Sequence, residues 1–573
     1  MKKSKFSLLL ILALVLSMFL AACSGGDKET GNETPKDDEG KKEEVASDVP
    51  QEVRILDSGE IPTMDSSLAE GSTSFTALNQ TNEGLYIQNE NSELIDGVAD
   101  GDPEANEDGT VFTVKIKDSA VWENDEPVTA HDFVYAFQRA LKPELASPYG
   151  PYMMGGKIKG AQEIVDAAAA GQQVDLNTLG VKAIDDKTLE VQTAKPMSVE
   201  FFKGLMAFGT FLPLNQKFVE EKGDAYASNA ENLLSNGPFK LTQWDGPTSQ
   251  EWVFEKNEKY HGADEIALTR IQYNVVKDSQ TAVNALETGE ADITGLLSSD
   301  LVPQYESDPR MQRWLESTIF WIKMNQTGES EGNKALQNEN IRRAIATGFD
   351  KEGLTASILN NGSVPANYAV PKDFVKGPDG KDFNEANGDM LTYNVEEAKK
   401  AWEAGLKELG TDKVTIRYLG GDTEASKKTD AYIKDQLEKN LPGLTIKLES
   451  VPFQVRLERD NSQDYDLQFA GWGPDYSDPI SFSDLWVTDG GSNRMGYSNP
   501  EYDKLIKEAQ STSDQTKRFE ALAKAEKILL DEDAGLAPVY QRGANILVAE
   551  KVKGFNYHQV GPDHSWRYLS ITE

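Results

Sequence analysis

Apolar and polar residues alternate along this chain with two periods, that of strands and that of amphipathic helices. Val111 to Lys117 alternates at period two behind the turn Glu107 to Gly109, which predicts a half-exposed strand in a hairpin. Thr129 to Asp132 has the form of a capping box, and the apolar spacing that follows predicts a helix ending near Pro143. Further strands are expected at 188–193, 252–255 and 414–418, and further helices at 281–288, 341–348, 396–406, 427–437 and 517–530. Strands interleaved with helices predict a mixed α/β fold.

A different pattern marks the N-terminus, where positive charge precedes an apolar run. The run from Leu8 to Leu20 is shorter than the roughly 20 residues of an easy bilayer crossing, so residues 1–22 are expected to be a cleaved export signal. The run ends in Leu20-Ala21-Ala22-Cys23, and Cys23 is the only cysteine, so no disulfide can form within the chain. This ending is similar to the lipobox of bacterial lipoproteins, which implies a lipid-linked Cys23 and a membrane anchor. The alternative is a plain secretory signal with an incidental cysteine.

Composition separates a tether from a folded part. Residues 23–48 are polar and charged with almost no large apolar side chain, so a flexible tether is expected. The roughly 520 residues that follow exceed the size of one hydrophobic core, which predicts two or more lobes. A net charge of −37 repels phosphate backbones, which argues against nucleic-acid binding. The expected location is the extracytoplasmic face of the cell membrane, as on a Gram-positive cell surface.

Residues that would indicate catalysis or a cofactor are scarce. None of the four histidines lies in an H-E-x-x-H arrangement, and His131 is expected on a helix surface. Nucleophile-elbow, phosphate-loop and dinucleotide fingerprints are absent from the sequence, so we expect no enzyme activity, no cofactor and no metal. Asp100 to Glu104 begins like a calcium loop but lacks the later ligands, and a solvated turn is the better interpretation. The 95 acidic residues leave many carboxylate pairs, so a secreted carboxylate-dependent hydrolase remains an alternative.

Four segments taken in order resemble a known family. They are Pro127 to Leu141, Ser235 to Leu241, Glu339 to Ala344 and Gly471 to Pro479. Together they are similar to the solute-binding proteins of oligopeptide ABC transporters, a family that includes dipeptide and nickel binders. The resemblance runs from about Val53 to the C-terminus.

The resemblance implies a bilobal, periplasmic-binding-protein-like α/β fold with a hinge and an additional domain on the N-terminal lobe. Ligand is then enclosed between the lobes as they close. The implied segments are 49–82, 209–320 and 544–573 for lobe I, 83–208 for the additional domain, and 321–543 for lobe II.

The resemblance also implies where a peptide binds. Glu70, Gly71, Ser72 and Thr73 correspond to an extended edge on lobe I, and Gly471, Trp472 and Gly473 to an edge on lobe II. Main-chain pairing with a peptide laid between such edges recognises groups that every peptide has. Glycine allows close approach of backbones, although glycine-rich turns are common in any protein.

One carboxylate has an implied role at the peptide N-terminus. Asp475 matches the family position that receives the α-ammonium group, whose transfer out of water demands an opposite charge. The alternative is that Asp475 only organises a turn beside Pro474.

Other side chains are implied less sharply. Trp472 either lines a side-chain pocket or belongs to the core. Tyr149 and Tyr152 lie in a segment that reaches toward the ligand in the family, and either hydroxyl is a candidate contact. Some members carry an arginine at the position of Phe469, and Arg459 is a candidate substitute for holding the peptide C-terminus.

The leading hypothesis is therefore a monomeric, membrane-anchored receptor that captures oligopeptides and presents them to ABC permease subunits. A second hypothesis keeps the fold and changes the cargo to a signalling peptide, a dipeptide or a metal chelate. The carboxylate-dependent hydrolase is the third.

Overall fold

The computed structural model describes residues 49–512 and 514–573. Val49–Glu573 forms one compact unit. The expected export signal (1–22), Cys23 and the expected tether (23–48) lie outside the described residues. Across the described part of the chain, no helix is both long and apolar enough to span a bilayer.

The first sheet joins distant parts of the sequence. Its strands, in spatial order, are β1 (Glu52–Asp57), β10 (Arg270–Val275), β9 (Glu251–Lys256) and β8 (Phe239–Gln243). β1 is parallel to β10, and the other pairs are antiparallel. Helix α2 (Ser72–Thr81) packs beside β8, and α8 (Ser279–Glu287) meets β1 through Ala282 and Leu56. All four strands come from the segments expected for lobe I.

The predicted hairpin and capped helix are confirmed within residues 83–208. The sheet there contains, in spatial order, β4 (Glu104–Ala105), β5 (Val111–Lys115), β7 (Thr188–Gln192) and β6 (Val181–Asp185), and a two-stranded hairpin of β2 (Tyr86–Gln88) and β3 (Leu94–Asp96) precedes it. Its helices are α3 (Ala130–Ala140), α4 (Tyr149–Met154), α5 (Ala161–Ala169) and α6 (Val199–Met206), and α7 (Gln216–Lys222) follows. The Asp132 carboxylate accepts the Thr129 backbone N–H at 2.8 Å, which closes the capping box of α3. His131 is exposed on this helix, as predicted.

The third sheet is the largest. Its strands, in spatial order, are β12 (Val364–Pro365), β16 (Leu536–Leu547), β11 (Met311–Met324), β15 (Leu467–Trp472), β13 (Val414–Gly421) and β14 (Leu444–Val451). β13 is parallel to both β14 and β15, and the other pairs are antiparallel. The helices of this part are α9 (Glu331–Leu336), α10 (Glu339–Thr347), α11 (Lys351–Gly353), α12 (Val395–Leu409), α13 (Glu424–Asn440), α14 (Phe453–Asn461), α15 (Ile480–Ser483), α16 (Pro500–Ser511) and α17 (Gln515–Lys527).

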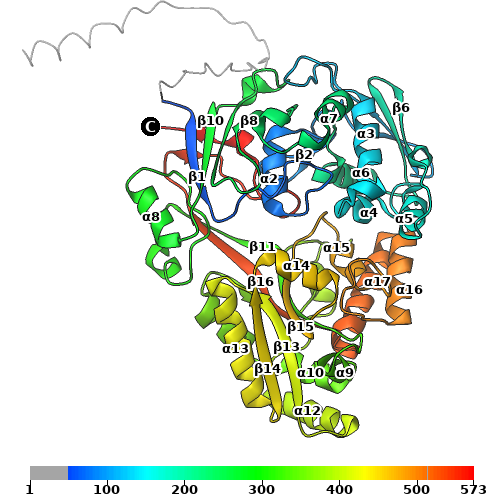
Figure 1. Ribbon diagram of the computed structural model, residues 1–573, viewed down its shortest axis with the longest axis vertical. Helices are drawn as coiled ribbons and strands as arrows, with labels where there is room; N and C mark the ends of the chain where they lie inside the picture. The colour runs from blue at the N-terminus through cyan, green and yellow to red at the C-terminus, as the bar shows by residue number, and fades with distance from the viewer. Residues whose placement is uncertain (1–48, 513) are drawn as a thin grey trace, which may run out of the picture. The chain divides into compact units, whose positions relative to one another are not determined.

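Two long strands of the third sheet, β11 and β16, extend toward the first sheet. Figure 1 shows β16 running from the region of α8 into the six-stranded sheet. At its far end the backbone N–H of Thr294 donates to the carbonyl of Leu547, and Ile293 bridges both β1 and Val548. β11 contains a register shift between Leu315 and Ile319. The borders expected at 320/321 and 543/544 thus fall inside continuous strands.

The chain ends beside its first described residues. β17 (Val552–Lys553) pairs with β18 (Ser570–Ile571). The side-chain amide of Gln51 donates to the carbonyl of Ile571 and accepts its backbone N–H, each at 2.9 Å. The C-terminal segment therefore packs on the same part of the molecule as β1.

Candidate functional site

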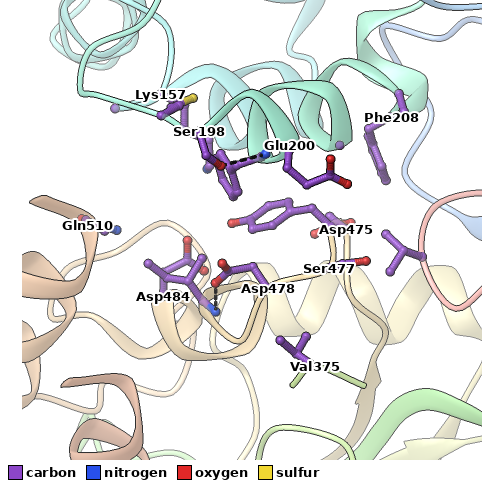
Figure 2. A pocket seen from close by; sticks show the side chains of 18 of the residues that line it. Lys157, Ser198, Glu200, Phe208, Val375, Asp475, Ser477, Asp478, Asp484 and Gln510 are labelled. Atoms are coloured by element: carbon purple, nitrogen blue, oxygen red, sulfur yellow. Dashed lines mark hydrogen bonds between the residues drawn. The ribbon is translucent and has the colours of Figure 1, made fainter. Parts of the chain in front are cut away.

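A cavity of about 1520 Å³ lies between residues 79–208 on one side and residues 375–378 and 475–519 on the other. Its walls come from α4, α6 and their neighbours on one side, from residues 475–519 on the other, and from residues 560–562. Figure 2 shows Lys157, Glu200 and Phe208 on one wall facing Asp475, Asp478 and Asp484 on the other. Cavities for drug-sized ligands usually measure about 300–1,000 Å³, so this one has room for a larger molecule.

Asp475 contributes a buried carboxylate to this cavity. The chain leaves β15, turns at Pro474, and the backbone N–H of Asp475 donates to the Ser481 hydroxyl at 2.9 Å, which fixes the turn. Asp475 is 5% exposed, and one carboxylate oxygen accepts the Tyr149 hydroxyl at 3.2 Å. The other oxygen, Oδ2, has no hydrogen-bonding partner among the described residues. Burial raises the pKa of Asp475 to about 7, because the charged form loses its hydration.

Tyr149 and Tyr152 lie opposite Asp475 on helix α4. The ring of Tyr149 stacks on Phe208 with centroids 5.6 Å apart, which holds its hydroxyl toward the carboxylate. The ring of Tyr152 meets Trp472 edge-on at 6.1 Å. The Tyr152 hydroxyl is buried without a hydrogen-bonding partner in the described part of the chain. The structure thus brings together side chains that the sequence separates by more than 300 residues.

Gly471, Trp472 and Gly473 lie beside the cavity, at the end of β15, and do not line it. The indole N–H of Trp472 donates to the carbonyl of Ser481 at 3.0 Å, so the half-buried ring packs as part of the wall behind Asp475. Gly471 pairs with Phe320 across β11, and a Cβ there would lie 2.8 Å from the Phe320 ring. This close approach explains why residue 471 is a glycine. Without a side chain, the backbone at this position is exposed.

The extended edge expected at Glu70 to Thr73 is wrong for its second half, because Ser72 and Thr73 are helical. Gly71 is extended, with φ −120° and ψ 148°, but it caps helix α2, and Ser72 and Thr73 form the first turn of that helix. The fourth residue, Glu70, is exposed, and none of the four lines the cavity. The short polar residues at 72–74 are compatible with a helix start as well as with an extended edge, and in the structure they begin helix α2.

Arg459 is not brought to the cavity. Its guanidinium donates to a Glu449 carboxylate oxygen at 2.6 Å and to the carbonyl of Asp464 at 2.8 Å, on its own side of helix α14. The structure therefore gives no support to Arg459 as the residue that holds a peptide C-terminus.

Four cavity residues escaped the sequence analysis. Lys157 and Asp484 line the same end of the cavity as Asp475, and burial lowers the pKa of Lys157 and raises that of Asp484 to about 6. Asp478 and Arg518 form a two-point ion pair in the wall, at 2.5 and 2.8 Å. Asp478 lies within the segment Gly471 to Pro479 that carried the resemblance, but nothing in the local sequence marked the other three. Only the fold brings them together.

Metal ligation finds no support in this geometry. Among residues 49–512 and 514–573, no three histidine, cysteine or acidic side chains gather in a way that could hold a metal ion.

A family comparison identifies what kind of protein has this architecture. Residues 93–494 match the model of the bacterial extracellular solute-binding proteins, family 5, middle region. The chain belongs to this family. This family is made up of solute-binding proteins of transport systems.

Curated relatives cover nearly the whole chain. The oligopeptide-binding protein OppA of Bacillus subtilis is 32% identical over 96% of this chain and 97% of its own length. The dipeptide-binding protein DppE of the same organism is 30% identical over 96% of both chains.

Solved structures of family members confirm the predicted fold class. A Listeria monocytogenes OppA bound to peptide is 42% identical with a TM-score of 0.82, covering 91% of this chain and 99% of the other. The pheromone receptor PrgZ is 33% identical with a TM-score of 0.83, covering 92% and 100%. The bilobal solute-binding fold is therefore established for this chain.

Proposed function

We propose that this protein captures oligopeptides in the cavity between its lobes and delivers them to an ABC permease for import. The observation that carries the proposal is Asp475: a buried carboxylate, in a cavity of about 1520 Å³, with one oxygen free of partners among the described residues. A peptide α-ammonium group supplies the positive charge that the carboxylate needs as a counterion and the N–H donors that Oδ2 lacks. Burying either charge alone costs several kcal/mol, so each stabilises the other only when they meet.

The backbone around Asp475 supports capture with little dependence on side-chain identity. Gly471 and Gly473 are exposed and carry no side chain that would keep another chain away. A peptide laid along this stretch can pair its N–H and C=O groups with main chain, as in strand addition. Tyr152 lines the cavity and then contacts the first peptide residues, while Trp472 packs behind it. The edge expected at Glu70 to Thr73 is not part of this proposal, because Ser72 and Thr73 are helical.

The names of relatives support peptide as the cargo. OppA of Bacillus subtilis is described as oligopeptide-binding, and DppE as dipeptide-binding. The Listeria structure is of an OppA bound to peptide, and PrgZ is a pheromone receptor with a determined mode of peptide binding. We infer that the present chain also binds peptide and performs no reaction on it.

We further propose that a lipid on Cys23 anchors the protein to the outer face of the cell membrane. The support is the sequence Leu20-Ala21-Ala22-Cys23 behind a short apolar run. The folded part then works as a monomer on the extracytoplasmic side, within reach of the permease.

Calorimetry with two forms of one peptide tests the capture proposal. Pentaalanine with a free amine binds, and N-acetylation weakens binding by about 2 kcal/mol or more, roughly 30-fold, because the buried carboxylate loses its charge partner. In Asp475→Asn the free-amine peptide binds more weakly, and acetylation makes little further difference.

Asp489→Asn, at an exposed position outside the cavity, serves as the matched control and retains the wild-type discrimination. Chromatography of the peptides after incubation shows them intact, which separates a receptor from a hydrolase. Equal affinity of the wild-type protein for the free and acetylated peptides contradicts the proposal.

A further inference from the structure

Four polar atoms without hydrogen-bonding partners among the described residues gather at one end of the cavity. They are Oδ2 of Asp475, Oδ1 of Asp484 and the hydroxyl oxygens of Tyr152 and Tyr476, and all four residues line the cavity. Buried polar atoms in folded proteins are nearly always satisfied, so such a cluster indicates a polar group that is not part of the chain. One ammonium group at Asp475 does not satisfy all four. This end of the cavity is therefore built for more of the ligand than its α-amine.

Lys157 reaches the same place from the opposite wall. Its Nζ donates to the carbonyl of Tyr152 at 3.0 Å and lies over the rings of Tyr152 and Tyr476, at 5.1 and 5.8 Å from their centroids. It makes no direct ion pair with a described carboxylate, but its charge acts on both Asp475 and Asp484 across the cavity. Figure 2 shows it on the wall that faces both aspartates.

The other charged side chains near this end are either paired or exposed to water. Asp478 is neutralised by Arg518 through two hydrogen bonds. Arg494 shares the Asp460 carboxylate with Lys323, and its side chain is 37% exposed. Glu200 on the facing wall is also exposed, so water screens the charges of both Arg494 and Glu200. Asp475, Asp484 and Lys157 then form the uncompensated set, and two carboxylates with one ammonium leave a single negative charge. One positive charge from the ligand balances these three groups.

We propose that Lys157 and Asp484 select the first residue of the peptide by charge, admitting a neutral, hydrogen-bonding side chain and disfavouring both acidic and basic ones. The inference rests on the proposed function, since the α-ammonium at Asp475 supplies the one balancing charge. A charged first side chain adds a second charge to a buried site that has no partner for it. A neutral side chain with hydroxyl or amide groups satisfies the free atoms of Asp484 and Tyr476.

The test uses three pentapeptides that differ only at the first residue, Asn, Asp or Lys, followed by four alanines. Calorimetry at pH 7.5 with the full mature protein gives the strongest binding for the Asn peptide, by about tenfold over each of the others. Lys157→Met removes the positive charge, so its preference moves by about tenfold or more toward the Lys peptide. Asp484→Asn removes a negative charge, so its preference moves toward the Asp peptide. These opposite shifts are not expected from a merely structural role.

Matched controls are Lys159→Met and Asp489→Asn, which change the same residue types at exposed positions outside the cavity and keep the wild-type order. Lys157→Gln is the second variant if the methionine variant does not fold. Wild-type binding of all three peptides with no change of order in either cavity variant overturns this inference and leaves the proposed function standing. A wild-type protein that binds none of them contradicts both.

Discussion

At the scale of single residues, Asp475 shows a conflict between binding and stability. Its carboxylate is buried near a second carboxylate, Asp484, and the nearby Tyr152, Tyr149 and Lys157 compensate its charge only in part. Such a group is held for its ligand, because the empty folded protein would be more stable without its charge. Residues of this kind are where a fold departs from the rule that buried charges are paired.

This conflict predicts a pH dependence of stability. The folded-state pKa of Asp475 is raised from 3.8 to about 7, so between pH 4 and pH 7 the folded state holds a proton that the unfolded chain releases. Stability from this group is therefore full below about pH 4 and is lost as the pH rises through 7. Asparagine has no charge to develop. We expect the unfolding free energy of peptide-free Asp475→Asn, relative to wild type, to increase by about 1 kcal/mol or more from pH 4 to pH 8.

Denaturant titrations at several pH values measure this difference. Asp108→Asn, at an exposed position, is the control and runs parallel to wild type across the range. Parallel curves for Asp475→Asn as well would show that the buried carboxylate does not destabilise the empty protein.

At the scale of elements, the apolar periodicity predicted which segments form helices but did not predict the residues at which those helices begin and end. The helix expected at 427–437 is α13 (Glu424–Asn440), and the one at 396–406 is α12 (Val395–Leu409), because capping residues outside the apolar stripe extend both helices. The helix expected at 517–530 begins as α17 and continues through a π-turn at Ile528–Glu532. Apolar spacing alone does not distinguish these two hydrogen-bonding patterns.

The candidate site was predictable only where a local motif marks it. Asp475, Trp472, Tyr149 and Tyr152 lie in or near segments that carry the family resemblance. Asp475 and Tyr152 line the cavity, and Tyr149 and Trp472 contact them from behind the wall. Lys157 and Asp484 are ordinary residues in their local sequence, and their proximity depends on the packing of two lobes. The prediction of an extended edge was wrong for Ser72 and Thr73, because their residue types are compatible with both an edge and a helix start.

At the scale of the whole molecule, two strands connect the parts that enclose the ligand. β11 and β16 are strands of the third sheet, and the end of β16 at Leu547 contacts Thr294 beside the first sheet. β11 has a register shift at Leu315 to Ile319. A change in the angle between the parts would have to bend these strands, which fits the hinge of a bilobal solute-binding protein. The hydrogen bond from Tyr149 to Asp475 joins helix α4 to the segment that follows β15.

The proposed anchor belongs to the same scale, since it determines where the receptor works. We expect the mature wild-type chain, expressed in a Gram-positive host, to begin at Cys23 with an acylated mass and to partition with membranes. Cys23→Ser should lack the acyl mass and leave the membrane fraction, with unchanged peptide affinity, because residues 49–573 form a compact unit by themselves. Acylation that persists in the serine variant would disprove the lipobox interpretation.

A crystal structure of the protein with a bound free-amine peptide is the most direct test of the central claim. The account predicts the α-ammonium nitrogen about 2.7–2.9 Å from Oδ2 of Asp475, inside the cavity, with the peptide backbone along Gly471 and Gly473. A peptide whose amino end lies away from Asp475, or whose backbone faces solvent on both sides, would contradict it.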